Sequence, residues 1–362
     1  MKTILFKYTS LLIFALPIVV SANKGEPKGK YTKEKTIKKE FNVNSDALLK
    51  VKNSYGNLNI TSWDENRILI EVQIKTNGNN EDKVQRKLDE IRVDFENSSS
   101  VVSARTIFGD KGSSWGWNWG KNNVNMQVNY TIKLPVKNSV HLNNDYGSII
   151  LDRVDGHAKI NCDYGRLEIG ELRGRNNELN FDYTSNSSIE YMNSGSIEAD
   201  YSGFTLGKTN DIRLDADYTN STIEQMKNLK YDCDYGKLEV NEASDVVGHG
   251  DYINVRLGTI HGDVEIDADY GQIKIAEMAE DAGSLTVNSD YTGVKMGYHP
   301  QYSFNFEVDL EYGGFSGKDG LELSVSKVKS TSKYYKGHYG NQNSGNNISI
   351  SSDYGSVSFH KN

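Results

Sequence analysis

Cysteine is scarce: the 362-residue chain has only Cys162 and Cys233. Both occupy the same position of an internal repeat, four repeats apart. At about 4.8 Å per repeat they would lie roughly 19 Å from each other, whereas a disulfide needs Cα atoms within about 7 Å. We therefore expect two free thiols that act as small buried residues.

Motifs that would indicate catalysis are also missing. The seven histidines are scattered, without metal-ligand spacing or cysteine partners. The single Gly-x-Ser-x-Gly match, at residues 112–116, stands in a segment rich in glycine, serine and asparagine, without the predicted strand and helix that a nucleophile elbow needs, and the chain has no phosphate-binding loop. We therefore predict that the protein is not an enzyme and holds no organic cofactor.

Only one long apolar run is present, at the start of the chain. Lys2 and Lys7 precede the run from Leu11 to Val20, and Ala22 follows it as a small-residue cleavage site. This pattern is typical of a secretory signal over residues 1–22. Since no other run approaches membrane-spanning length, we expect an exported protein of the periplasm, cell surface or medium, without a transmembrane segment.

The charge is unevenly distributed. Removal of Lys2 and Lys7 with the signal changes the formal charge from −8 to −10. Residues 24–40 carry seven lysines and three glutamates, so residues 23–40 are predicted to form a basic linker on an acidic body. The acidic body argues against a nucleic-acid partner, and the linker is either simply solvated or attracted to an anionic envelope surface.

The dominant feature is a repeat of about 18 residues marked by an acid followed by tyrosine. In most copies, positions −6, −4 and −2 from the tyrosine are apolar or small, and positions +3 and +5 are apolar again. Alternation of this kind predicts two short strands with one buried face and a corner between them. The tyrosines are Tyr55, Tyr146, Tyr164, Tyr183, Tyr201, Tyr218, Tyr235, Tyr252, Tyr270, Tyr291, Tyr312 and Tyr354.

Such units cannot bury their apolar faces alone, so they are expected to stack. We predict an all-β protein, a single-stranded parallel β-solenoid or β-helix, right-handed, with rungs of about 18 residues. Residues 41–140 would form the first rung and an N-terminal cap with one short helix that begins after Asn80. Residues 141–362 would form the stack, with an inserted surface loop at 327–347.

Three tryptophans, Trp115, Trp117 and Trp119, lie close together among glycine, serine and asparagine within the predicted cap. They could plug the end of the stack. They could equally form an aromatic contact surface for a glycan or a protein partner. Both interpretations stay open at the level of sequence.

The acid that precedes every repeat tyrosine except Tyr55, where Ser54 stands instead, should form a column on the solvent side. Neighbours in this column repel by about 0.9 kcal/mol even at the dielectric constant of water. One interpretation is that backbone N–H groups at the following corner offset this repulsion. The other is Ca²⁺ binding by the densest acidic patch, which comprises Asp215, Asp217, Asp232, Asp234, Asp267 and Asp269. By parity the tyrosines should face inward, with an exposed sugar-binding ladder as the alternative.

The order of parts resembles the bacterial putative-adhesin family of exported β-strand-repeat domains, of the type found in Bacteroidetes. The resemblance rests on Leu49–Ile60 with its central Gly56, on Trp63-Asp64, on the strand at Ile68–Ile74, on Tyr130–Pro135, and on the following glycine-marked repeats. It implies a stacked β fold and an extracytoplasmic, non-catalytic role, and it assigns no binding residues.

The function expected from the sequence is therefore that of an adhesin or a structural protein of the cell envelope, with an envelope glycan or surface protein as partner. Two alternatives stay open: a carbohydrate-active β-helix enzyme and a Ca²⁺-stabilised surface scaffold. The acid column has no interleaved column of arginine or lysine, which argues against the enzyme.

Overall fold

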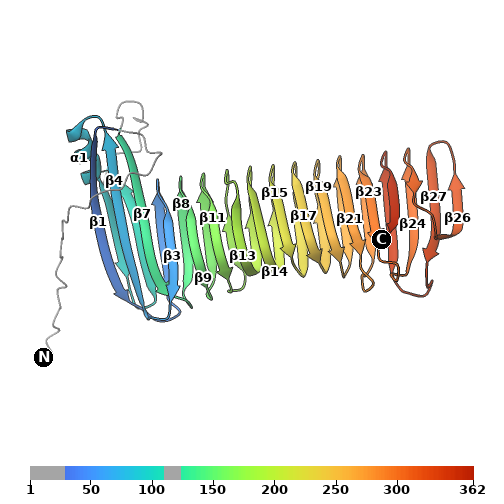
Figure 1. Ribbon diagram of the computed structural model, residues 1–362, viewed down its shortest axis with the longest axis horizontal. Helices are drawn as coiled ribbons and strands as arrows, with labels where there is room; N and C mark the ends of the chain where they lie inside the picture. Colours follow the sequence, from blue (N-terminus) through green and yellow to red (C-terminus); the bar gives the residue numbers. More distant parts are fainter. Residues whose placement is uncertain (1–28, 110–123) are drawn as a thin grey trace.

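A computed structural model describes residues 29–109 and 124–362. Almost all of its regular structure is β-strand, and the described residues contain one helix. The strands hydrogen-bond into one long sheet network, which forms an elongated body with a wider N-terminal end (Figure 1). The predicted all-β class is confirmed. The finer prediction, that the rungs close into a helical coil, stays a prediction.

Each repeat consists of two short strands on either side of its tyrosine, and we call this unit a rung. In the regular part of the chain the rung strands are β2 (Leu48–Ser54), β3 (Leu58–Trp63), β8 (Ser139–Asp145), β9 (Ile149–Val154), β10 (Ala158–Asp163), β11 (Leu167–Leu172), β12 (Asn177–Asn180), β13 (Ser187–Glu198), β14 (Gly203–Asp215), β15 (Asn220–Gln225), β16 (Asn228–Asp232), β17 (Lys237–Ala243), β18 (Asp245–His249), β19 (Asn254–Ile260), β20 (Val264–Asp269), β21 (Gln272–Met278), β22 (Leu285–Asp290) and β23 (Gly293–Tyr298).

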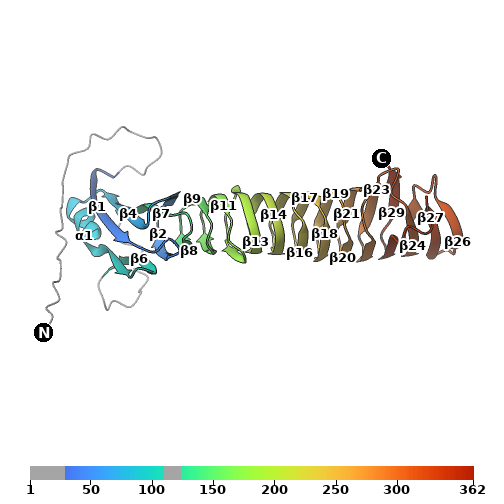
Figure 2. The ribbon, with the colours of Figure 1, turned by 90° about the horizontal axis from the view of Figure 1, so that it is seen from below.

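Equivalent strands of neighbouring rungs pair in parallel and in register. In the pair β8–β10, for example, Val140 lies beside Ala158 and Asp145 beside Asp163. The inward positions are filled by fully buried aliphatic side chains such as Leu214, Leu257 and Ile266. Because the pairing is parallel and in register, residues at the same position of successive rungs form a continuous column along the body. Figures 1 and 2 show the strands themselves as two rows.

The N-terminal cap is built from longer antiparallel strands and the helix. Its elements are β1 (Tyr31–Asn42), β4 (Arg67–Gly78), α1 (Glu81–Glu90), β5 (Ile91–Asn97), β6 (Val101–Phe108) and β7 (Val124–Pro135). Strands β6 and β7 pair with β2 and β3 of the first rung. As predicted, Asn80 caps α1 by accepting a hydrogen bond from the Lys83 N–H, and Val84 and Leu88 are buried.

One prediction about this end of the chain is wrong. Residues 31–40 of the expected linker belong to β1, which pairs along its whole length with β4. The alternating side chains of this strand include many lysines and glutamates, which hid its period-2 pattern. The predicted signal, residues 1–22, lies outside the described residues.

The C-terminal end uses β24 (Phe304–Glu311), β25 (Phe315–Ser316), β26 (Glu322–Val328), β27 (Ser332–Tyr339), β28 (Asn347–Asp353) and β29 (Val357–Lys361). Strand β28 inserts between β22 and β24, so the last rung of the chain is the second-to-last in space. Much of the loop expected at 327–347 is instead the hairpin β26–β27, which pairs antiparallel with β24 and covers its free edge. That expectation is corrected.

Candidate functional site: an exposed tyrosine ladder

All twelve repeat tyrosines adopt left-handed backbone conformations, with φ between 50° and 64°. The chain therefore turns at the tyrosine itself and not at the residue after it. This turn reverses the parity of the strand, so the prediction of inward-facing tyrosines is wrong. Eleven of these side chains are 45–57% exposed and Tyr55 is half-buried.

The twelve rings form one continuous stack, which we call the tyrosine ladder. Neighbouring ring centroids lie 4.7–5.1 Å apart, with interplanar angles of 1–8°. The spatial order follows the rungs, so Tyr354 stacks between Tyr291 and Tyr312. At the N-terminal end, Phe108 meets Tyr55 edge-on at 5.8 Å.

This spacing determines what the ladder can offer to a ligand. A planar group inserted between two rings would need contact distances of about 3.5 Å on both sides, and the centroid spacing leaves no such gap. The ring edges and hydroxyl groups are therefore the available surface. Eleven steps of about 4.8 Å give a straight ladder about 53 Å long.

The left-handed backbone of each ladder tyrosine costs free energy, and ring stacking recovers an amount of similar size. A left-handed conformation costs an L-residue about 1–2 kcal/mol, whereas glycine and asparagine adopt it readily. An offset aromatic pair stabilises by about 0.5–1.5 kcal/mol. The two effects have similar size, so local stability alone does not explain tyrosine at every corner.

An acid precedes every ladder tyrosine except Tyr55, where Ser54 stands instead, and these acids form a second column, which we call the acid row. It comprises Asp145, Asp163, Asp182, Asp200, Asp217, Asp234, Asp251, Asp269, Asp290, Glu311 and Asp353. Along its centre, each carboxylate accepts a hydrogen bond from the backbone N–H of the next aspartate in the row. Six such bonds, 2.7–3.3 Å long, link Asp182 through Asp290.

These bonds refine the structural interpretation of the acids. Backbone donors do offset the repulsion, but they come from the next rung and not from the following corner. Burial, with the charges of neighbouring carboxylates as a further cause, raises the pKa of Asp163, Asp217 and Asp290 above the ordinary value. Burial and the adjacent phenols likewise raise the pKa of Tyr201 and Tyr235, so these two phenols are uncharged at neutral pH.

The six acids proposed for Ca²⁺ are divided between two columns. Asp217, Asp234 and Asp269 belong to the acid row, and Asp215, Asp232 and Asp267 lie two residues before it on exposed positions. Among the residues that the structure describes, no group of three or more His, Cys, Asp or Glu side chains could hold a metal ion. The Ca²⁺ hypothesis stays a prediction without a coordinating group in this part of the chain.

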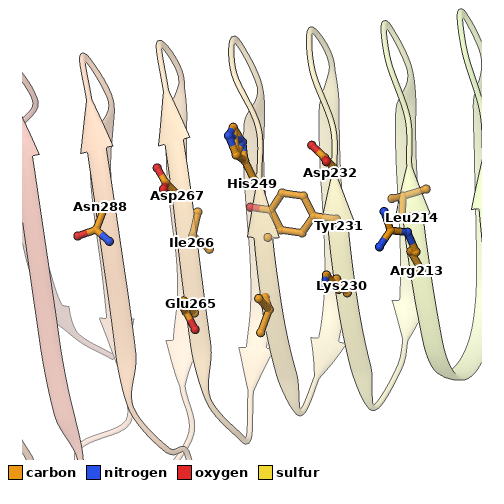
Figure 3. Close-up of a pocket in the computed structure, with 12 residues that line it drawn as sticks. Arg213, Leu214, Lys230, Tyr231, Asp232, His249, Glu265, Ile266, Asp267 and Asn288 are labelled. Atoms are coloured by element: carbon orange, nitrogen blue, oxygen red, sulfur yellow. The ribbon is translucent and has the colours of Figure 1, made fainter.

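Two of those acids line a depression of about 210 Å³ on the outer face of β14, β16, β18 and β20 (Figure 3). Asp232, His249 and Asp267 lie on three neighbouring strands there, with Lys230 and Arg213 nearby. Gly248 leaves room for the ring of Tyr231, whose buried hydroxyl has no hydrogen-bond partner in the described chain. Asp232 and Asp267 are two rungs apart, about 10 Å, too far to share one ion.

The remaining sequence predictions concern the three tryptophans, the two cysteines and the absence of a transmembrane segment. Trp115, Trp117 and Trp119 lie outside the described residues. Cys162 and Cys233 are free and buried, as predicted. Burial raises the pKa of each thiol to about 12. Within the described residues, no helix has the length and apolar character needed to cross a bilayer.

Comparison with known proteins gives backbone likeness only. No protein-family model and no curated protein matches the chain. A putative adhesin from Parabacteroides distasonis is 12% identical, covering 70% of this chain and 92% of its own, with a TM-score of 0.37. A putative adhesin from Parabacteroides merdae is also 12% identical, covering 75% and 98%, with a TM-score of 0.34.

A third solved structure, called a putative lipid binding protein from Parabacteroides distasonis, is 12% identical and covers 90% and 96%, with a TM-score of 0.28. The two adhesin names agree with the family resemblance found in the sequence. At these TM-scores the likeness carries no information about the tyrosine ladder.

Proposed function

We propose that this protein is a non-catalytic, exported binding protein of the adhesin or envelope-structural type, built as a parallel β-solenoid. The tyrosine ladder is its contact surface. One observation carries the proposal: twelve tyrosines occupy strained corners and stack into a single exposed line. Backbone strain retained at every corner is typical of functional positions.

Tyrosine is well suited to such a surface. It presents a large amphipathic edge at low cost in conformational entropy, and its hydroxyl both donates and accepts hydrogen bonds. In the described chain no hydrogen bond joins the hydroxyls of Tyr146, Tyr201 or Tyr252 to another residue, so these groups are available. A long, straight ridge of this kind suits an extended partner better than a small molecule.

The carbohydrate-active enzyme is the weaker candidate. Glycoside cleavage uses two carboxyl groups that flank one bond, one of them free to exchange a proton. The central carboxylates of the acid row are each engaged by a backbone N–H of the next rung. These hydrogen bonds favour a structural role for the acids. The exposed tyrosines have no comparable structural role, which favours the ladder as the contact surface.

The test compares two variants in binding to isolated native envelope fragments. In the ladder variant, Tyr201, Tyr218, Tyr235 and Tyr252 become Asn, which tolerates the left-handed conformation. The control variant changes exposed residues at the far corners of the same rungs, without altering net charge: Lys208→Asn, Glu224→Asn, Lys227→Asn and Glu242→Asn.

We expect wild type and control to co-sediment with the envelope, the ladder variant to lose at least tenfold in retained protein, and no reducing sugar ends to be released. Equal retention of all three proteins would reject the ladder as the contact surface. Release of reducing ends by wild type would favour the enzyme instead.

A further inference from the structure

The spacing of the ladder restricts the kind of partner that can contact it along its length. A partner that meets every tyrosine must repeat about every 4.8 Å along a straight line, which is the spacing of hydrogen-bonded β-strands. A second copy of this chain has the same tyrosine spacing at every rung, including each small deviation from 4.8 Å. The ladder of a second copy can therefore match this ladder tyrosine by tyrosine.

Over three consecutive rungs the two sides of the ladder differ in charge. On one side lies the acid row. On the other side, consecutive rungs carry Arg256 on β19, Lys274 on β21 and Lys295 on β23, all exposed and without an ion-pair partner among the described residues. The same rungs contribute Asp251, Asp269 and Asp290 to the acid row, so each presents one acid and one unpaired cation across its tyrosine.

Symmetry then selects one orientation for two ladders that meet face to face. If the molecules are related by a two-fold axis parallel to their length, the acid row of each faces the Arg256, Lys274 and Lys295 side of the other, at the same rung. If the molecules are antiparallel, acid row faces acid row and the charges repel.

We propose that two copies of this chain associate side by side and parallel through their tyrosine ladders. The inference rests on the proposed role of the ladder as a contact surface, and it names the partner. A ridge about 53 Å long, formed where two rows of strands about 10 Å apart meet, covers roughly 530 Å² per copy before the flanking charged side chains are counted, which approaches the roughly 800 Å² per partner of a standard stable interface. Opposed ring edges and hydroxyls form its centre, and the charge pairs form its rim.

Sedimentation velocity over a concentration series is the first test. Wild type and the control variant should dimerise, whereas the ladder variant should be at least tenfold weaker. The variant Arg256→Glu, Lys274→Glu, Lys295→Glu leaves the ladder intact and should also weaken the dimer at least tenfold, with the loss diminished at high salt. A monomeric wild type at all concentrations would overturn the proposal.

Single cysteines test the orientation. Tyr183→Cys and Tyr270→Cys each lie fourth from an end of the ladder, at opposite ends, and the native Cys162 and Cys233 are buried. In a parallel dimer each variant should form a disulfide-linked homodimer under mild oxidation, and wild type should not. Links that form only in a mixture of the two variants would show an antiparallel dimer and overturn the proposal.

The two proposals fail separately. A monomeric wild type that still binds envelope through its tyrosines would remove self-association and leave the proposed function standing. A dimer that depends on the ladder, in a protein whose envelope binding does not, would remove the envelope-binding function and retain the dimer.

Discussion

Two columns that lie two residues apart in every rung behave in opposite ways. The buried column at position −2 varies widely, with Asn144, Cys162, Phe181, Ala216 and Ser352 as examples, although all are less than 4% exposed. The exposed column is tyrosine in all twelve rungs. Protein interiors usually constrain identity more strongly than surfaces do. The reversal here indicates that the exposed column is defined by something other than packing.

The largest expected effect is on the interior. Leu214 on β14 is fully buried, so Leu214→Ala should lower the free energy of unfolding by about 2–5 kcal/mol through lost burial and a cavity. Urea-induced unfolding measures this loss. An exposed leucine on β26 supplies the control, because Leu323→Ala should change stability by less than about 0.5 kcal/mol.

The ladder residue of the same rung should behave differently. In Tyr218→Asn, relief of about 1–2 kcal/mol of backbone strain opposes the loss of stacking on both sides. We therefore expect the free energy of unfolding to change by less than about 1 kcal/mol. If Tyr218→Asn lowers the free energy of unfolding as much as Leu214→Ala does, the tyrosines stabilise the fold as the buried residues do. The proposed difference between the two columns would then be wrong.

A smaller effect concerns the acid row and pH. Because the pKa of Asp217 is raised in the folded chain, folding favours its protonated form. This stabilisation is complete below the unfolded pKa near 3.9 and is lost as the pH rises through the higher folded value. Asp217→Asn retains an oxygen acceptor for the Asp234 N–H and removes the charge.

The Asp217→Asn variant should therefore be more stable than wild type at pH 7, by less than about 1 kcal/mol. The advantage should shrink in high salt and vanish near pH 3. Thermal melting at the three conditions measures it. A variant less stable than wild type at pH 7 would show that the attraction of the Asp217 carboxylate to the Asp234 N–H outweighs its repulsion by neighbouring carboxylates.

The smallest effect concerns the thiols. Since burial raises the pKa of Cys162 and Cys233 to about 12, neither should react with iodoacetamide at pH 8 within minutes, and both should react in urea. Mass spectrometry reads the modification. Rapid labelling of either thiol in the folded protein would contradict its place in the buried column.

The repeat, the two strands of each rung and the buried positions could all be predicted, because period-2 alternation depends only on local sequence. The direction of the tyrosines could not. The change from apolar positions −4 and −2 to +3 and +5 shows that a corner lies between them, but it does not show whether Tyr164 or Tyr270 ends the strand or forms the corner itself. An aromatic residue at positive φ is rare enough that sequence patterns favour the following glycine as the corner.

Two further features depended on contacts distant in sequence. The insertion of β28 between β22 and β24 reverses the order of the last rungs, and no local pattern encodes it. The charged strand β1 is recognisable only by its pairing with β4. The stack of rings likewise follows from the register of the rungs, which single-sequence patterns do not contain.

The most direct test of the account is envelope retention of the ladder variant, in which Tyr201, Tyr218, Tyr235 and Tyr252 are Asn, measured beside its far-corner control. We predict that the control is retained like wild type, and that the ladder variant is lost from the envelope fraction while its melting transition is preserved. Retention of the ladder variant at the wild-type level would contradict the claim that these exposed tyrosines form the contact surface.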